Sequence, residues 1–214
     1  MRTWIKICGT TSLEDALSSI EAGADALGFI FAESKRRVSV EQAQQIISQL
    51  PREIERIGVF MNNSAAEICS VVTTVELTGV QMHGEESPVT VYECLPPARR
   101  DGMRKIRTIQ IKPGQELGLD DHGGLSRVVD AWLLDSGAGS GKTFDWESAR
   151  KKLGDRQGQF VVAGGLNPEN VVEAIRVFKP WGVDVVTGVE REPGRKDPEK
   201  LRAFVAAVRK AEQA

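Results

Sequence analysis

The chain has 214 residues, of which 41% are hydrophobic and 27% are charged, and its formal net charge is -2. The balance of 28 basic against 30 acidic residues excludes the basic footprint of a protein that binds nucleic acid or an anionic membrane surface. No apolar run approaches the roughly 20 residues of a membrane span, and the first residues lack a secretory signal pattern.

Short apolar runs alternate with longer amphipathic ones along the whole chain. Runs rich in Val, Ile, Leu or Phe predict buried parallel strands at 4–8, 25–31, 56–61, 78–82, 103–109, 130–135, 159–163 and 182–187. Between them, helical patterns span 12–22, 39–50, 63–74, 87–97, 145–153, 168–179 and 197–213, with a weak one near 113–121. Dividing 214 residues among eight units gives about 27 each, which predicts a single α/β domain over 1–214, a (β/α)8 TIM barrel.

Capping residues support several of these helix starts. Ser12 with Asp15, and Ser39 with Gln42, resemble capping boxes, and Asn167 before Pro168 predicts an N-cap. An open doubly wound sheet stays possible, because a pattern cannot show closure. The absence of a G-x-G-x-x-G turn after the first strand argues against it.

The stretch "LLDSGAGSGKTFDW" at 133–146 resembles a nucleotide-binding P-loop. The P-loop pattern requires a glycine five residues before Gly141, where this chain has Ser136. The stretch also follows the sixth predicted strand and leads into a short helix. We therefore expect no ATP site here.

Polar residues at the carboxyl ends of barrel strands converge on one mouth, where barrel enzymes hold their active sites. Cys8 ends the first strand and Asp135 ends the sixth. A lone cysteine is often a small buried hydrophobe, but beside Lys6 we expect its pKa to be lowered. Asp135 could simply accept loop N–H bonds. Together the two could form the base and acid of a proton-shuttling isomerase.

Two further groups of residues near this mouth suggest an anionic substrate. Gly164, Gly165 and Gly188 follow the last two strands, where backbone N–H groups commonly bind phosphate, and Gly141 could close a third side. Each could be an ordinary turn glycine. Arg36 and Arg37 could be a solvated pair, or one of them could hold a carboxylate in a forked geometry.

Cysteine and histidine usage bears on location and cofactors. Cys8, Cys69 and Cys94 are odd in number, which favours reduced thiols in the cytoplasm. His83 and His122 have no partner at metal-ligand spacing. We expect no metal site.

Nine motifs, in this order, resemble those of the phosphoribosylanthranilate isomerase family. They are "KICGTT", "SKRRVS", "GVFMN", "GVQMHGEE", "LLDS", "GSGKTFDW", "AGGLNPENV", "GVDVVTGVE" and "PGRKD", and they run from Lys6 to Asp197. The resemblance implies a cofactor-free isomerase of tryptophan biosynthesis. Its substrate would be a phosphoribosyl compound, and the protein would be a monomer or homodimer.

The resemblance also implies roles for individual residues. Cys8 would be the general base, Asp135 the general acid, and Arg36 the carboxylate ligand of an Amadori rearrangement. The phosphate would lie against the loops that carry the residues Gly141, Gly164, Gly165, Thr187 and Gly188.

This chain departs from the family pattern in three places. Val186 and Thr187 replace two serines, residues 138–141 read "AGSG" where the family has "GGTG", and Arg37 replaces a frequent aromatic residue. Which arginine meets the carboxylate is therefore open.

Three alternatives remain. An imidazole-pathway isomerase would carry an aspartate in place of Cys8. Indole-glycerol-phosphate synthase would need catalytic lysine and glutamate residues in the early strands. A non-catalytic phosphosugar-binding barrel would not need both Cys8 and Asp135.

Overall fold

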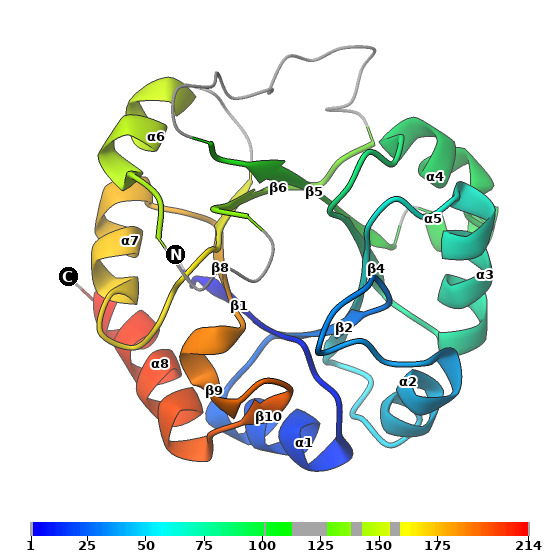
Figure 1. Ribbon diagram of the computed structural model, residues 1–214, viewed down its shortest axis with the longest axis horizontal. Helices are drawn as coiled ribbons and strands as arrows, with labels where there is room; N and C mark the ends of the chain where they lie inside the picture. The colour runs from blue at the N-terminus through cyan, green and yellow to red at the C-terminus, as the bar shows by residue number, and fades with distance from the viewer. Residues whose placement is uncertain (1, 101, 113–127, 138–142, 155–158, 214) are drawn as a thin grey trace.

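Eight parallel strands close into a barrel in chain order, with the helices on the outside (Figure 1). The computed structural model describes residues 2–100, 102–112, 128–137, 143–154 and 159–213. The strands are β1 (Trp4–Cys8), β2 (Ala26–Ile30), β3 (Glu55–Phe60), β4 (Gly79–Met82), β5 (Arg104–Gln110), β6 (Ala131–Asp135), β7 (Phe160–Val162) and β8 (Gly182–Val185). β1 pairs with β8, with Lys6 opposite Asp184. This closure confirms the (β/α)8 prediction and excludes an open sheet.

The outer helices follow the strands as the amphipathic patterns predict. They are α1 (Leu13–Ala22), α2 (Val40–Ile47), α3 (Ala65–Val75), α4 (Pro88–Cys94), α5 (Pro97–Arg100), α6 (Trp146–Leu153), α7 (Val171–Phe178) and α8 (Pro198–Ala211). Within the described ranges, no helix is long and apolar enough to cross a membrane. The weak helix expected near 113–121 lies outside the described residues, as do residues 138–142 of the P-loop-like stretch.

The helix starts show where the capping predictions were right and where they were not. The Ser12 hydroxyl accepts a bond from the backbone N–H of Asp15, and Ser39 accepts one from Gln42. The start predicted for α7 at Pro168 is wrong, because residues 168–170 form a turn. The side chain of Asn167 caps that turn by accepting bonds from the N–H groups of residues 169 and 170.

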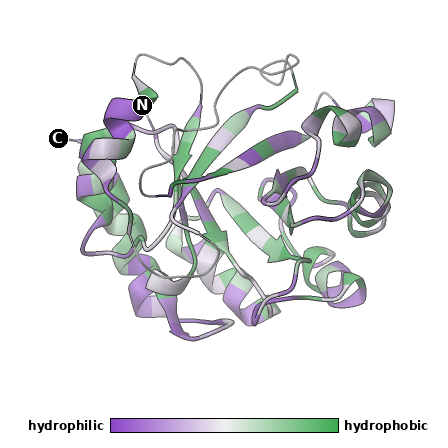
Figure 2. Cartoon of the chain, turned by 45° about the horizontal axis from the view of Figure 1, so that its top comes forward, coloured by the Kyte–Doolittle hydropathy of each residue, from purple (hydrophilic) through white to green (hydrophobic). Residues whose placement is uncertain are grey.

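Hydrophobic residues form two separate cores, one inside the barrel and one between the barrel and the helices. On β1, Trp4 joins the inner core, whereas Ile5 and Ile7 join the outer one. Figure 2 shows the mostly hydrophobic strands interrupted by hydrophilic segments. Because side chains alternate along a strand, Lys6 and Cys8 share the inward face with Trp4. The same alternation places Asp135 inside the barrel, two residues after Leu133 of the inner core.

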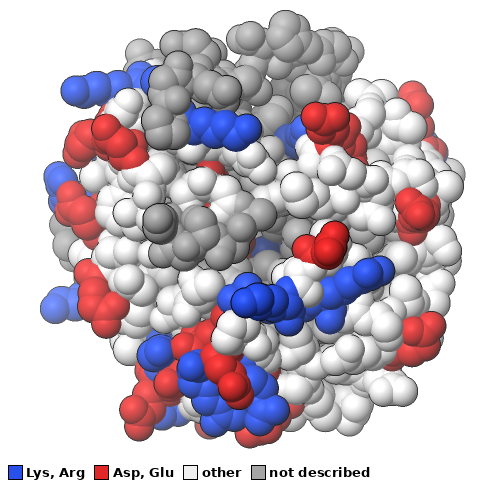
Figure 3. Space-filling model, in the orientation of Figure 1, with Lys and Arg blue, Asp and Glu red and all other residues white. Residues whose placement is uncertain are grey.

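A short hairpin between β8 and α8 was not predicted. A 3₁₀ turn (Thr187–Val189) leads into β9 (Glu190–Glu192), which pairs antiparallel with β10 (Arg195–Lys196). Figure 1 shows the hairpin beside α1 and α8, and Figure 3 shows acidic and basic side chains interspersed over this region. The sequence "EREPGRK" does not predict the hairpin, because the segment is short and lacks the apolar alternation of a strand.

Aromatic rings close the amino end of the barrel. The rings of Trp4 and Trp181 stack with their centroids 4.9 Å apart. The Arg104 guanidinium lies 4.7 Å from the centre of the Trp181 ring. It also donates two hydrogen bonds, of 2.6 and 2.8 Å, to the carboxylate of Glu55. Stacked rings and an ion pair therefore hold this end of the barrel together, beside a hollow that Glu55 and Arg104 also line.

Candidate active site

A cavity of about 350 Å³ opens at the carboxyl ends of the strands. Its wall includes most of the site residues that the sequence predicts: Cys8, Arg36, Asp135, Gly164, Gly165 and Thr187. Gly188 is not part of this wall, and Gly141 lies outside the described residues. Side chains from β1, β6 and the loop after β2 thus meet around one space, although they are far apart in the sequence.

Cys8 is almost fully buried at the end of β1. Gly28 on the neighbouring strand provides the room, because a Cβ there would lie 2.5 Å from the sulfur. Burial raises the pKa of the Cys8 thiol, and the nearby Lys6 ammonium only partly offsets this effect. The expectation of a lowered pKa is therefore wrong for the free protein. The cation is present, but desolvation of the thiolate outweighs it.

Lys6 forms a buried ion pair that the sequence analysis did not identify. Its ammonium nitrogen lies 2.9 Å from Oδ1 of Asp184, and its side chain is fully buried. Burial opposes the charge on Lys6, but attraction to Asp184 and Cys8 raises its pKa above the ordinary value. The sequence does contain a signal for this pair: β1 and β8 each carry one charged residue at an inward position. The two strands become neighbours only when the barrel closes, so the signal cannot be read from either strand alone.

Asp135 ends β6 on the opposite side of the cavity and is 7% exposed. Burial raises the pKa of its carboxyl group. Nε2 of His83 lies 3.8 Å from its Oδ2 atom, and burial lowers the pKa of His83, which favours the neutral imidazole. Both effects favour a protonated Asp135 beside a neutral histidine. This environment suits a carboxylic acid that donates a proton.

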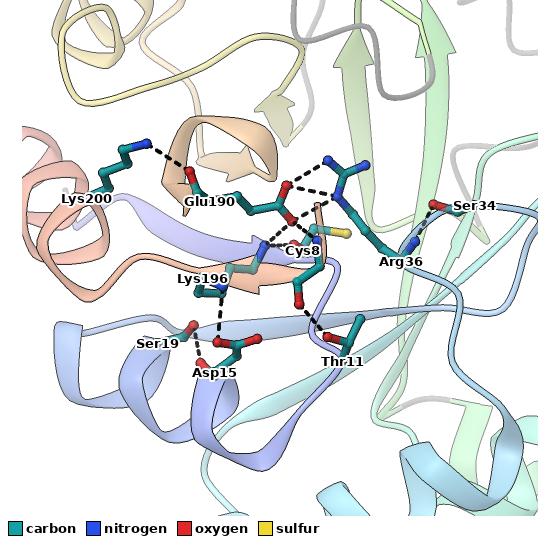
Figure 4. A network of polar contacts seen from close by, with 10 residues as sticks. Cys8, Thr11, Asp15, Ser19, Ser34, Arg36, Glu190, Lys196 and Lys200 are labelled. Carbon is teal, nitrogen blue, oxygen red and sulfur yellow. Dashed lines mark hydrogen bonds and ion pairs between the residues drawn. The ribbon is translucent and has the colours of Figure 1, made fainter. Parts of the chain in front are cut away.

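Arg36 and Arg37 have different surroundings. Arg36 is buried and lines the cavity, whereas Arg37 is exposed. Nε and Nη2 of Arg36 bond to the carboxylate of Glu190 at 2.8 and 2.7 Å. The remaining nitrogen points away from Glu190 (Figure 4). Arg36 can therefore offer the free end of its guanidinium to a second carboxylate.

The glycines in the loops after β7 and β8 are required for different structural reasons. Gly164 and Gly165 adopt left-handed backbone angles, with φ of 79° and 69°, which glycine reaches at little cost. A Cβ at Gly188 would lie 2.0 Å from the carbonyl oxygen of Leu166. Gly188 thus lets the loops after β7 and β8 approach closely, while Gly165 and Thr187 form the cavity wall.

Two other residues of the site, Gln81 and His83, lie at the end of a predicted strand, but the sequence assigned them no role. Gln81 lies on the cavity wall, and its buried Oε1 atom has no hydrogen-bond partner among the described residues. His83 follows β4 as a strand-end residue, but nothing in the sequence places it beside Asp135. Within the described ranges, no cluster of three or more His, Cys, Asp or Glu side chains could hold a metal ion.

Comparisons with known proteins agree with this geometry. The family model for N-(5'-phosphoribosyl)anthranilate isomerase matches residues 5–207. The enzyme of that name from Citrifermentans bemidjiense is 43% identical over 210 residues, covering 97% of this chain and 98% of that protein.

Two solved structures are similar along almost the whole chain. A phosphoribosyl anthranilate isomerase from Thermus thermophilus superposes with a TM-score of 0.83 at 33% identity, covering 98% of this chain and 99% of the other. Another phosphoribosyl anthranilate isomerase is in complex with reduced 1-(o-carboxyphenylamino)-1-deoxyribulose 5-phosphate. It has a TM-score of 0.76 at 36% identity and covers 97% of this chain and 99% of its own. The chain therefore belongs to the N-(5'-phosphoribosyl)anthranilate isomerase family.

Proposed function

We propose that Asp135 and Cys8 are the acid and base with which this isomerase converts N-(5-phosphoribosyl)anthranilate to 1-(2-carboxyphenylamino)-1-deoxyribulose 5-phosphate in tryptophan biosynthesis. The reaction is an aldose-to-ketose Amadori rearrangement, in which C1 is reduced and C2 is oxidised within one molecule. The observation that carries the assignment is the placement of Cys8 and Asp135 on the wall of one cavity, at the ends of β1 and β6.

Asp135 acts in the first step as general acid. Its carboxyl group protonates the ring oxygen of the ribose, the bond between that oxygen and C1 breaks, and the nitrogen lone pair forms an iminium with C1. The raised pKa of Asp135, caused mainly by burial, keeps a proton available for this transfer.

Cys8 acts in the second step as general base. The iminium makes the hydrogen on C2 acidic, and the thiolate removes it. The C–H electron pair then forms a C1=C2 double bond, which gives an enolamine that tautomerises to the ketone. Burial disfavours the thiolate in the free protein. A positive iminium beside the sulfur adds to the effect of Lys6 and favours the thiolate when it is needed.

The two charged ends of the substrate would bind at different parts of the wall. We assign the anthranilate carboxylate to the free end of the Arg36 guanidinium, because Arg36 is buried at the cavity and Arg37 is exposed. We assign the phosphate to the loops after β7 and β8, near Gly165 and Thr187. The backbone there can approach an anion closely, because Gly164 and Gly165 occupy left-handed conformations.

We place the reaction in the cytoplasm. The three cysteines, two of them buried, are all free thiols, and free thiols are the rule in a reducing compartment.

Direct turnover tests the proposal. The purified protein, with no metal or cofactor added, is expected to consume N-(5-phosphoribosyl)anthranilate, followed as loss of the substrate's fluorescence. Arg36→Ala is expected to raise KM at least tenfold, as the loss of a charge-assisted carboxylate contact predicts, while Arg37→Ala changes KM less than twofold. Binding without turnover would leave a phosphosugar-binding barrel as the better description. Equal, small effects of both arginine substitutions would refute the carboxylate assignment.

A further inference from the structure

A chain of buried charges connects the backbone of the base to the arginine of the carboxylate site. The ammonium group of Lys196 donates to the carbonyl oxygen of Cys8 at 2.6 Å and to Oε1 of Glu190 at 3.2 Å. The same Glu190 carboxylate accepts the bonds from Nε and Nη2 of Arg36. Figure 4 shows the four residues side by side, with Glu190 between the two cations. The side chain of Lys196 is fully buried, and that of Glu190 is 4% exposed.

The hairpin that carries this chain is fastened to the segment that follows β1. The hydroxyl of Thr11 donates to the carbonyl of Gly194 at 2.6 Å, and the N–H of Gly194 donates to Glu190 at 3.2 Å. The aliphatic part of Arg36 passes close over Gly9, where a Cβ would lie 2.8 Å from its Cδ atom. The hairpin, the base and the arginine therefore pack as one unit.

Burying three charges is a poor way to stabilise a fold, since desolvation offsets most of the attraction. The buried charges are better explained by an active site in which two catalytic or binding groups must be held at a fixed distance from each other. We propose that Glu190 and Lys196 are positioning residues that fix the Arg36 guanidinium relative to the backbone of Cys8. The substrate's carboxylate and its C2 carbon then meet two points of one rigid unit. This inference rests on the proposed roles of Arg36 and Cys8.

Substitutions of Glu190 separate positioning from charge. Glu190→Gln removes a negative charge beside Arg36, so a purely electrostatic role predicts tighter binding of the anionic substrate and a lower KM. Positioning predicts a KM higher by about tenfold, because the guanidinium loses its anchor. Glu190→Asp keeps the charge but shortens the reach. It is therefore expected to raise KM as well, whereas a charge role predicts no change. Glu192→Gln removes a charge from the exposed end of the same strand and serves as the control.

Substitution of Lys196 tests the connection to the base. Lys196→Met keeps the length of the side chain but removes the bonds to Cys8 and Glu190. It is expected to lower kcat and raise KM together, each by about tenfold. The control is Lys200→Met, because Lys200 is exposed and contacts only the backbone oxygen of Glu190 in the described part of the chain. A Lys196→Met protein with a lower melting temperature but unchanged kcat and KM would show a merely structural role.

A double variant distinguishes failure of this inference from failure of the proposed function. If Glu190 acts through Arg36, adding Glu190→Gln to Arg36→Ala raises KM less than twofold further, because coupled residues are not additive. Full additivity, or a Glu190→Gln enzyme with a lowered KM, would overturn the inference while Arg36 keeps its role. If Arg36→Ala itself leaves KM unchanged, the carboxylate assignment fails, and the positioning role fails with it. Circular dichroism of each variant, together with the charge-conserving Glu190→Asp, keeps the test valid if Glu190→Gln does not fold.

Discussion

At the amino end of the barrel, inward charges are paired with each other and stacked on aromatic rings, whereas at the carboxyl end they surround the cavity that holds Cys8 and Asp135. Arg104 has its guanidinium stacked near Trp181 and bonded to both oxygens of Glu55. At the other end, the Asp135 carboxylate accepts backbone hydrogen bonds from Ser136 and Gly137, and its ion-pair contact with His83 is long, at 3.8 Å. Arg36 keeps one guanidinium nitrogen directed away from its partner.

This difference shows how to separate stability from function within one barrel. Charged groups that are paired with each other stabilise the amino end, and their loss is expected to lower the free energy of unfolding. Charged groups at the carboxyl end that are incompletely paired can still bind a substrate. Their loss is expected to lower turnover more than stability. The predictions below test this separation, beginning with the largest expected effect.

Asp135→Asn is expected to lower kcat by about 10²–10⁴, the usual contribution of a positioned acid or base. An amide keeps the shape of the carboxyl group but has no acidic proton to give to the ring oxygen. Because burial raises the pKa of Asp135, a neutral side chain is well tolerated, and the melting temperature at neutral pH is expected not to fall. Steady-state kinetics and thermal melts check both parts. An active Asp135→Asn enzyme would remove the acid from this end of the barrel.

Cys8→Ser is expected to lower kcat over a similar range, about 10²–10⁴, while KM changes little. A hydroxyl is too weakly acidic to act as its anion at neutral pH. Cys69→Ser and Cys94→Ser are matched controls on α3 and α4, and both are expected to keep nearly full kcat. Near wild-type turnover by Cys8→Ser would contradict the assignment of the base.

Arg104→Ala is expected to lower the free energy of unfolding by about 1–2 kcal/mol, through loss of the ring contact and of a charge-assisted bond. Its kcat is expected to stay within a factor of two of wild type. Arg176→Ala removes an exposed pair with Glu173 on α7 and is expected to leave the free energy of unfolding nearly unchanged, because solvent screens such a pair. Urea denaturation measures both values. A large loss of kcat in Arg104→Ala would mean that the two ends of the barrel are coupled.

The pH dependence of alkylation tests whether burial raises the pKa of Cys8. Burial raises the pKa of this thiol, so the thiolate is scarce at neutral pH and becomes abundant only as the pH rises above the ordinary thiol value. In a protein with Ser at 69 and 94, the rate of reaction with iodoacetamide is expected to rise about tenfold per pH unit through pH 7 to 9. A rate that levels off below pH 8 would mean that Lys6 outweighs burial.

Much of the fold could be predicted from the sequence, because buried parallel strands carry strong apolar runs. β1 begins and ends where its run does, at Trp4 and Cys8. β8 ends at Val185, before the predicted 187, because Thr187 starts a 3₁₀ turn within the same apolar stretch. The hairpin of β9 and β10 could not be predicted, since its stability comes from contacts with the distant β1 loop rather than from its own pattern.

The site was partly predictable for a related reason. Cys8 and Asp135 each end a strand, and the carboxyl ends of barrel strands share one mouth. The residues that contact Cys8 and Asp135 and set their environments are distant in the sequence, so no local pattern predicts them. His83 meets Asp135 only in three dimensions, and Lys196 bonds to a carbonyl 188 residues earlier in the chain. The net rise in the pKa of Cys8 also depends on burial, which the adjacent lysine in the sequence does not reveal.

The pairing of β1 with β8 has a consequence for how the protein is made. β1 is the first strand to leave the ribosome, but its ion pair joins residues 178 positions apart. Until β8 has been synthesised, one side of β1 has backbone groups without their native partner, as at the open edge of a sheet, and such edges invite pairing with other chains. Contacts of this range also slow folding. A nascent chain that stalls before Gly182 thus carries both an open edge and an incomplete base, and the catalyst exists only once β8 and the residues after it have joined the first strand.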